Sequence, residues 1–441
     1  MLGAWEHCSL TEIRMNDNEI LHNGTAKKVQ RLFTAEQTFE YFVQILVTGG
    51  FLATLLSRNG VPDFLVGIIS SFISLTCIVQ MFSAKLVRKA SGVKRTVFLL
   101  ILFNEIIFLL LYVIPLFSIP TYIKCIVFVV FIFTAYVLYN LVAPLKFSWY
   151  MLFVPTNERG RYTAKKEIIS LLGGIVFSFI MGTLSDYYNE RGQENTAFII
   201  CAVAIFAVSV VHISSILSTP AHSLDVSSGK GFFSSLKALK NRAVVAVLVL
   251  EIMWRCAMFM SNPFYGIYQT KELGFTLTQV SLLAIIQSVT RSSVSFGMGK
   301  IADRYGWRIN LTLCLSAAFV SYGVMIFCTP GNGLIIYGLH NVFMGIAQAG
   351  INSGLMNIYF DYVPTAERTA TLGVKAAIGG VFGFLTTTIA GLCLARMQES
   401  EMSIAGTPVY AQQILSLVSA IITVIAVFYA FFVIKRLHKA E

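Results

Sequence analysis

The chain has 441 residues, of which 56% are hydrophobic and only 12% are Asp, Glu, Lys or Arg. Soluble domains carry about 25% charged residues, so this composition excludes a soluble enzyme, a disordered chain and a secreted disulfide scaffold. The net charge of +11 does not indicate a nucleic-acid partner, because the basic residues lie in short clusters between long apolar runs. We therefore expect an all-α integral membrane protein whose main partner is the lipid bilayer.

Twelve apolar runs are long enough to cross a bilayer, since a spanning helix needs about 20 apolar residues. Backbone groups in lipid must bond within their own segment, so each run is expected to be helical. In chain order the runs occupy residues 39–57, 64–84, 97–117, 122–145, 167–186, 196–217, 243–262, 276–299, 309–329, 333–360, 370–395 and 411–434. The sequence thus predicts twelve transmembrane helices.

Lys and Arg are distributed unevenly among the segments between these runs. With a cytoplasmic N-terminus, the inner segments hold 24 of them and the outer loops hold five. Because basic residues concentrate on the cytoplasmic side, we expect a multi-pass plasma-membrane protein with both termini in the cytoplasm. The first 38 residues lack the apolar core of a signal peptide, and Met15 is an alternative start to Met1.

The second half of the chain repeats a pattern of the first. The segment VPTNERGRYTAKKE (154–167) is similar to VPTAERTATLGVKA (363–376) at an offset of 209, and Glu40 matches Glu251 at an offset of 211. Such a duplication predicts two pseudo-symmetric six-helix bundles. We expect bundles at 36–217 and 243–435, cytoplasmic tails at 1–35 and 436–441, and a linker at 218–242 that is either a short interfacial helix or a flexible segment.

Two six-helix halves with basic inner loops resemble the major facilitator superfamily of secondary transporters. The stretch GKIADRYGWR (299–308) is similar to the superfamily's loop signature, a Gly–x–x–x–Asp–Arg–x–Gly run followed by basic residues. The equivalent first-half loop, AKLVRKASGVKR (84–95), departs from the signature, with Arg88 in place of the Asp. The resemblance implies two halves that rock about a central site and open it to one compartment at a time.

The resemblance also implies that the signature loop meets the inner end of the fifth helix. We therefore expect a breakable cytoplasmic latch between Asp303 and either Arg159 or Arg161; the alternative is a set of solvated loop charges. The residues expected at this gate are Asp303, Arg304, Arg159, Arg161, Glu367 and Arg368.

Polar side chains recur at helical spacing on the first, fourth, seventh and tenth runs, whereas the sixth, ninth and twelfth show almost none. Polar side chains in a membrane usually face the protein interior or a water-filled cavity, and the resemblance implies that helices 1, 4, 7 and 10 surround the cavity. The residues expected to line it are Gln44, Tyr136, Asn140, Arg255, Asn262, Gln287, Arg291, Asn341, Gln348, Asn352 and Lys375.

Glu40, Glu251 and Glu105 lie within apolar runs and are candidates for proton coupling. Burial of a carboxylate favours its protonated form, which proton coupling requires. Glu251 precedes Arg255 by four residues, so it is alternatively half of a structural ion pair. Glu40 has Gln44 at that spacing and no base on its own helix, which makes it the better candidate. Glu105 lies on a peripheral helix, where a neutral, hydrogen-bonded acid is expected.

The mixture of bases, acids, amides and phenols suits a small polar organic solute, either sugar-like or carboxylate-bearing. We expect a monomeric secondary active transporter that works by alternating access, is driven by a proton gradient, and has no cofactor or metal. The alternatives are a proton-coupled exporter of drugs or amphipathic compounds and a non-transporting membrane nutrient sensor. No nucleophile–base pair, metal-ligand set or phosphate-binding glycine loop suggests an enzyme.

Overall fold

The computed structural model describes residues 25–82, 92–154, 159–220, 242–355, 368–399, 403–404 and 407–433. Within these residues, eleven helices are long and apolar enough to cross a membrane. A further helix, α13 (Leu277–Tyr305), has 29 residues but is more polar. The all-α membrane fold expected from the sequence is confirmed.

The first half contains six helical segments in chain order. α2 (Thr25–Leu46) and α3 (Gly49–Arg58) form the first segment, and α4 (Asp63–Ser70), α5 (Phe72–Leu75) and the 3₁₀ helix η1 (Thr76–Phe82) form the second. The other four are α7 (Val93–Val113) with the short η2 (Ile114–Leu116), α8 (Thr121–Met151), α9 (Arg159–Asn189) and α10 (Glu194–Leu217).

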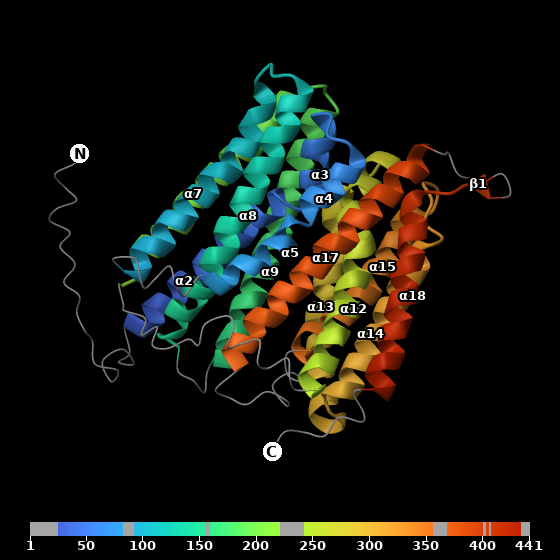
Figure 1. The fold of residues 1–441 in the computed structure, drawn as a ribbon. Coiled ribbons are helices and arrows are strands. Elements are labelled where there is room, and N and C mark those ends of the chain that lie inside the picture. Colours follow the sequence, from blue (N-terminus) through green and yellow to red (C-terminus); the bar gives the residue numbers. More distant parts are fainter. Residues whose placement is uncertain are drawn as a thin grey trace.

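The second half begins with α12 (Arg242–Ile267), which continues into one π-helical turn, η4 (Tyr268–Glu272). It is followed by α13, α14 (Trp307–Met325), α15 (Gly333–Gln348), α17 (Arg368–Glu399) and α18 (Ala411–Phe432). A small antiparallel pair, β1 (Ser403–Ile404) and β2 (Thr407–Pro408), projects between α17 and α18 (Figure 1).

α2 begins well before the expected helix start at residue 39 and extends into the segment expected to be a tail. The hydropathy pattern placed the helix start at residue 39 because Glu36 is charged, and Glu40 lies just inside the predicted run. Both side chains are nevertheless buried, at 0% and 6% exposure, because a base from another helix neutralises them. The interfacial helix expected at 218–242 falls almost entirely outside the described residues.

Helices from the two halves meet in two related pairs. The second segment (α4, α5 and η1) packs against α17, and α9 packs against α13; Figure 1 shows α17 running beside α4 and α5. Exchanging the halves converts one pair into the other, because each pair joins the second helix of one half to the fifth of the other. This packing is that of a pseudo-twofold arrangement.

Matched glycines allow close backbone approach in both pairs. A Cβ atom at Gly182 of α9 would lie 3.0 Å from the carbonyl oxygen of Leu277, and one at Gly391 of α17 would lie 3.3 Å from that of Phe64. Gly182 and Gly391 are related by the repeat offset of 209. Close contact between the halves is therefore built into the duplicated sequence.

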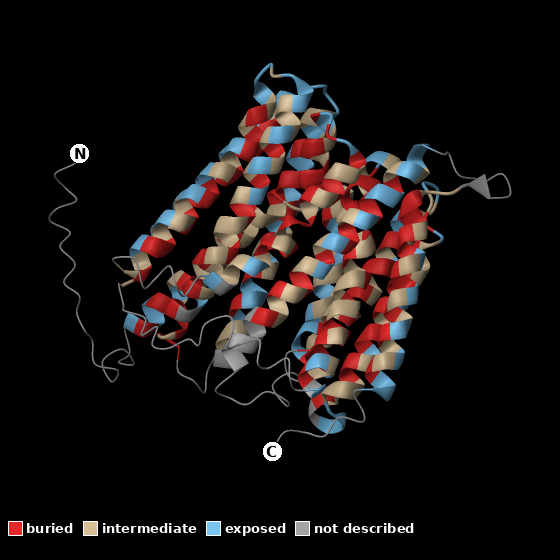
Figure 2. Cartoon of the chain, viewed as in Figure 1, coloured by how far each residue is buried: buried red, intermediate tan, exposed pale blue. Residues whose placement is uncertain are grey.

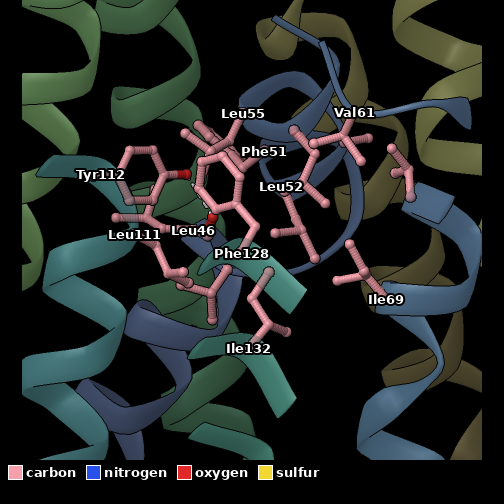
Figure 3. Packing of buried hydrophobic residues seen from close by; sticks show 14 of the residues in the cluster. Leu46, Phe51, Leu52, Leu55, Val61, Ile69, Leu111, Tyr112, Phe128 and Ile132 are labelled. Carbon is pink, nitrogen blue, oxygen red and sulfur yellow. Dashed lines mark hydrogen bonds between the residues drawn. The ribbon is translucent and has the colours of Figure 1, made fainter. Parts of the chain in front are cut away.

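Apolar side chains fill the interior of the first half and also cover its outside. Figure 3 shows Phe51 and Leu52 of α3 packed near Tyr112 of α7 and Phe128 of α8, within one buried cluster. Large apolar residues such as Phe103 are exposed, and Figure 2 shows exposed segments along the outer helices. An apolar exterior of this kind suits contact with lipid.

Candidate functional site

A central cavity of about 350 Å³ lies between the two halves. It is bounded by α2, α3 and α9 from the first half and by α12, α13 and α15 from the second. Four of the expected cavity residues line it: Gln44, Asn262, Gln287 and Asn341. Among the described residues its wall contains no Asp, Glu, Lys or Arg. Amides rather than full charges therefore face this space, whose volume is that of a small-molecule site.

The first transmembrane helix is interrupted beside this cavity. α2 ends at Leu46 and α3 begins at Gly49, whose φ of 54° lies in the left-handed region that favours glycine. The buried Tyr112 hydroxyl donates to the carbonyl oxygen of Leu46 at 2.6 Å. The Tyr136 hydroxyl donates to that of Val47 at 3.2 Å. Irregular backbone in a membrane needs such partners. Tyr136 therefore supports the interruption of the helix. Contrary to expectation, it does not line the cavity.

A second cavity, of about 470 Å³, adjoins the first, and Gln287 and Ser288 line both. The expected cavity residues Arg291 and Gln348 lie in its wall. Arg291 Nη2 donates to Oε1 of Glu167 at 2.6 Å. Because Arg291 is on α13 and Glu167 is on α9, this ion pair joins the two halves.

Five ionisable side chains are buried together inside the first half. This N-terminal charge cluster consists of Glu36, Glu40, Glu105, Lys146 and His212, which come from α2, α7, α8 and α10 and are at most 6% exposed. The ammonium Nζ of Lys146 lies 2.7 Å from Glu36 Oε1 and 2.5 Å from Glu40 Oε1. Charges this deeply buried are stable only when paired and hydrogen-bonded, so Lys146 is what allows both carboxylates to be there.

His212 lies between two carboxylates of this cluster. Its Nε2 is 3.0 Å from Glu36 Oε1, and its Nδ1 is 2.7 Å from Glu105 Oε1. A neutral imidazole carries one N–H group, so it donates to one carboxylate and turns a lone pair toward the other. Both contacts are favourable only when these three residues share one further proton, on the imidazole or on a carboxyl group. The geometry therefore provides a buried proton-binding position.

Glu105 is hydrogen-bonded, as expected for an acid on a peripheral helix. Its Oε2 accepts a hydrogen bond from the Ser209 hydroxyl at 2.7 Å, in addition to the contact with His212. The residue before it is also engaged, since Asn104 Nδ2 donates to the carbonyl oxygen of Ala135. Glu105 thus belongs to the charge cluster rather than to either cavity.

Gln37 connects the N-terminal charge cluster to the second cavity, whose wall it shares with Lys166. Its Nε2 donates to Glu40 Oε2 at 2.9 Å, and its Oε1 accepts from Lys166 Nζ at 3.0 Å. Through Lys146, an unbroken series of polar contacts then runs from the cavity wall to the buried imidazole. This is the one side of the cluster on which the described contacts reach a cavity.

The second half contains a smaller group, the C-terminal charge cluster of Glu251, Arg255 and Lys375. Arg255 Nε donates to Glu251 Oε1 at 3.0 Å, and Lys375 Nζ lies 3.3 Å from Glu251 Oε2. Glu251 is 3% exposed, whereas the side chains of Arg255 and Lys375 are 32% and 12% exposed. The carboxylate of Glu251 is thus paired with two basic side chains. Arg255 and Lys375 line neither of the two cavities, contrary to expectation.

Two further residues expected at the cavity lie elsewhere. Asn140 is buried; its Nδ2 donates to Thr76 Oγ1 at 2.8 Å and its Oδ1 accepts from Gln80 at 2.6 Å, so it joins α8 to η1. Asn352 is exposed and lines neither cavity. Helical spacing shows which residues share a face, but it does not show which way that face points.

The expectation that the sixth, ninth and twelfth helices lack buried polar groups is wrong. α10 buries His212, α14 buries Ser321, and α18 buries Ser416. The Ser321 hydroxyl bonds to His340, and that of Ser416 bonds to Tyr265. A single polar residue hardly changes the mean hydropathy of a strongly apolar helix, so averaging hid these groups.

The expected cytoplasmic gate lies largely outside the described residues. Nothing is described of Glu367 or of the side chains of Asp303, Arg159, Arg161 and Arg368. Arg304 is described: it is exposed, and its guanidinium lies 5.2 Å from the ring centre of Tyr305. The latch involving Asp303 stays a prediction.

At the opposite end of the helices, polar contacts join the two halves. Asp186 near the end of α9 accepts hydrogen bonds from the backbone N–H groups of Leu277 (2.9 Å) and Thr278 (2.7 Å), which begin α13. A carboxylate is stabilised at such a helix N-terminus. Asp63 at the start of α4 forms an ion pair with Lys271 of η4 at 2.9 Å. These contacts join the halves beside a further cavity of about 530 Å³, whose wall includes Asp186 and Lys271.

The oxygen and nitrogen atoms of Glu36, Glu40 and His212 lie close enough together to suggest a metal site. The Lys146 ammonium, however, contacts both carboxylates directly. It takes the position of a bound cation, so this group of residues does not fit a metal ion.

The family model of the Major Facilitator Superfamily matches residues 38–387 and 247–440. The chain belongs to the major facilitator superfamily. It is therefore a multi-pass membrane transporter and not an enzyme, as the sequence motifs suggested. A comparison with curated protein sequences gives no match.

Solved structures of superfamily transporters share this fold. A mutant of the nucleoside transporter NupG aligns with a TM-score of 0.71 and 12% identity, covering 91% of this chain and 99% of its own. A bacterial homologue of the human lysosomal transporter Spinster, inward-facing and unoccupied, gives 0.69 and 12%, covering 94% and 98%. A D-xylose–proton symporter gives 0.68 and 12%, covering 93% and 98%.

Sequence reasoning missed three members of the N-terminal charge cluster of this superfamily transporter: Glu36, Lys146 and His212. Glu36 and Glu40 are four residues apart and share one face of α2, a signal that was lost because the helix start was placed too late. Lys146 and His212 are isolated ionisable residues in apolar runs, which is itself a functional signal. Their partners could not be read, since 106 residues separate Lys146 from Glu40 and 176 separate His212 from Glu36.

Proposed function

We propose that this transporter moves a small polar organic solute across the plasma membrane by alternating access, coupled to protons. The central cavity is the solute site, because it lies between the halves and its wall comes from both. The N-terminal charge cluster is the proton site. Gln37 and Lys166 link the two, because both residues line the second cavity and Gln37 bonds directly to Glu40.

The position of His212 between Glu36 and Glu105 carries the proposal. The cluster holds three carboxylates and one ammonium group, and the buried Lys166 adds a second ammonium group beyond Gln37. Negative charge is therefore still in excess unless the cluster binds a proton. Because an uncompensated buried charge is unfavourable, a proton bound there stabilises the cluster. The Lys146 ammonium already lies between Glu36 and Glu40, which favours a proton over a sodium ion as the coupling ion.

The distribution of basic residues supports an orientation with both termini in the cytoplasm. In that orientation the contacts of Asp186 and Asp63 join the halves on the outer side, and the second cavity, where Arg291 and Glu167 join the halves, lies toward the cytoplasm. Coupling energies in proteins are typically about 1–3 kcal/mol, and a few partly buried hydrogen bonds and one ion pair are of the right size to break in each cycle.

The transporters that share this fold support this class of solute. One is a nucleoside transporter, and another is a D-xylose–proton symporter. Nucleosides and xylose are small and polar, and the symporter moves its sugar together with a proton. An exporter of amphipathic compounds would be better served by a more apolar cavity wall than one bearing Gln44, Asn262 and Asn341.

Uptake into proteoliposomes tests the proposal. The purified full chain is reconstituted, and uptake of D-glucose, D-xylose, uridine and D-glucuronate is measured with and without an acidic exterior. We expect the pH gradient to accelerate uptake of at least one solute and to drive its accumulation. Uptake that never responds to the gradient would exclude proton coupling.

Two matched substitutions locate the proton site. Glu40→Gln removes a carboxylate from the N-terminal charge cluster, and Glu251→Gln removes its counterpart from the second half. Glu40→Gln should abolish accumulation but retain exchange of solute at equal concentrations, because exchange needs no net proton movement. Uptake by the Glu251→Gln variant should still depend on the pH gradient. Wild-type accumulation by the Glu40→Gln variant contradicts the assignment.

A further inference from the structure

Charged side chains are kept away from the described wall of the central cavity. Glu251 is bonded to Arg255 and Lys375, and Glu40 to Lys146, and none of these residues lines the cavity. An anionic solute requires a basic partner and a cationic solute an acidic one, because a buried unpaired charge is strongly unfavourable. The described wall supplies neither.

His340 is the histidine in the described wall of the cavity. Its side chain is fixed by neighbouring residues of the protein. It is 4% exposed, and its Nδ1 lies 2.8 Å from Ser321 Oγ and 3.1 Å from the Ser321 carbonyl oxygen. The rings of Tyr265, Tyr322 and Tyr337 pack around it, with centroids 5.1 to 6.3 Å away. His340 is therefore packed into the wall rather than presented as a cation to an acidic solute.

The same wall offers hydrogen-bonding groups that the described residues leave unused. The side-chain amides of Gln44 and Asn341 form no hydrogen bond with any other described residue. Asn262 also lines the wall, although its Oδ1 and the Tyr337 hydroxyl are themselves closed off from the cavity. Amides supply donors and acceptors. A solute with matching uncharged groups would bond to the amides of Gln44 and Asn341.

Aromatic rings complete the wall. Tyr41 of α2 and Tyr265 of α12 line the cavity on opposite sides of the boundary between the halves. The Tyr265 hydroxyl is fixed by Ser416 at 2.9 Å, which holds its ring in position. Aromatic side chains provide large apolar contact area, which suits the face of a sugar ring or a nucleobase.

We propose that the transported solute is uncharged and ring-shaped, and that it is recognised through several hydroxyl or amide groups, as in a monosaccharide or a nucleoside. This inference rests on the proposed transport function, but not on proton coupling. Of the two solute types expected from the sequence, it selects the sugar-like one and rejects the carboxylate-bearing one.

Exchange measured with the pH gradient collapsed tests the solute class separately from coupling. Proteoliposomes containing the full chain are given three pairs with matched rings: D-glucose with D-glucuronate, D-glucose with D-glucosamine, and uridine with uridine monophosphate. We expect at least one neutral member to exchange and its charged partner to compete about tenfold more weakly. Equal or stronger competition by the charged member overturns the inference, as does the absence of exchange by every neutral member.

The two proposals fail in different ways. Exchange of a neutral solute that ignores an imposed pH gradient would remove proton coupling and leave the solute class standing. Exchange of D-glucuronate that responds to the gradient would leave proton coupling standing and remove the proposed solute class.

A substitution in the wall makes the test specific to the cavity. Asn262→Asp adds a carboxylate there and should weaken competition by the neutral solute about tenfold while improving that of D-glucosamine. Asn195→Asp is the matched control, because Asn195 is exposed at the start of α10 and lines neither cavity. Should Asn262→Asp fail to fold, Gln44→Glu tests the opposite wall. Unchanged selectivity in the folded wall variant contradicts the inference.

Discussion

The two charge clusters descend from matched positions in the duplicated chain, yet they are connected differently. Glu40 corresponds to Glu251 at an offset of 211, and Lys166 corresponds to Lys375 at an offset of 209. In the second half the lysine contacts the glutamate directly. In the first half Gln37 stands between them, and the glutamate turns to another base.

Their charge balance differs as well. The N-terminal cluster has three carboxylates, one ammonium group and an imidazole held between two carboxylates. The C-terminal cluster has one carboxylate and two bases. A buried group with an excess of carboxylates is stabilised by a proton, whereas one with an excess of bases is not. Duplication thus gave both halves a buried acid, and the surrounding helices gave the first cluster more carboxylates than ammonium groups and the second more bases than acids.

Replacing Lys146 should have the largest effect. Leu355 occupies the equivalent position in the second half, at the offset of 209, so Lys146→Leu makes the halves more alike. It leaves Glu36 and Glu40 without their base, and removal of one partner from a buried pair costs about 3–5 kcal/mol. We expect a large fall in the thermal unfolding midpoint of the purified protein in detergent.

Arg255→Leu is the counterpart of that substitution in the second half. Lys375 remains bonded to Glu251, and the Arg255 side chain is partly exposed, so we expect a loss of about 1 kcal/mol or less. Equal destabilisation by the two substitutions would show that the clusters do not differ as described.

Replacing His212 should affect coupling rather than exchange. His212→Gln keeps a polar side chain but cannot gain a proton between Glu36 and Glu105, so gradient-driven uptake should fall to the rate seen without a gradient. Initial uptake rates measured across acidic and neutral pH should lose their dependence on pH. A pH profile identical to that of the wild type would rule out the imidazole as part of the proton site.

Gln37→Leu should have a smaller effect on gradient-driven uptake than His212→Gln. Leu248 stands at the equivalent position at the offset of 211, and the substitution cuts the contact between Lys166 and Glu40. Since a hydrogen bond to a charged group contributes about 1.5–3 kcal/mol, gradient-driven uptake should slow about tenfold. Gln30→Leu is the control, because Gln30 bonds to the Phe153 carbonyl oxygen and not to the cluster. Equal rates for the two variants would argue against the Gln37 connection.

Much of the fold could be predicted because a membrane restricts the choice. Long apolar runs must be helices in lipid, and the repeat from Glu40 to Glu251 established two related halves. The polar stripes also located Gln44, Asn262 and Asn341 at the central cavity. The start of the first helix was misplaced because charges that are paired inside the protein have the same effect on hydropathy as charges in water.

The contacts within the N-terminal charge cluster could not be predicted, because its residues are far apart in the sequence. Lys146, Glu40 and His212 meet only after α2, α8 and α10 pack, and sequence spacing carries no information about contacts between helices. The direction of a polar face was equally hidden. Asn352 shares helical spacing with Asn341 but lines neither cavity, and Asn140 shares a face with Tyr136, which does not line them either. Sequence spacing therefore predicted which residues share one face of a helix. The packing of the helices determines which residues that face contacts.

Proton movement during solute uptake is the most direct measurement of the proposed difference between the clusters. Weakly buffered proteoliposomes containing a pH indicator are given the neutral solute that the wild type exchanges best, with no gradient imposed. We expect that uptake by the wild type and by Glu251→Gln removes protons from the medium, and that uptake by Glu40→Gln and His212→Gln does not. Proton uptake that persists in Glu40→Gln and His212→Gln, or is lost only in Glu251→Gln, would contradict it.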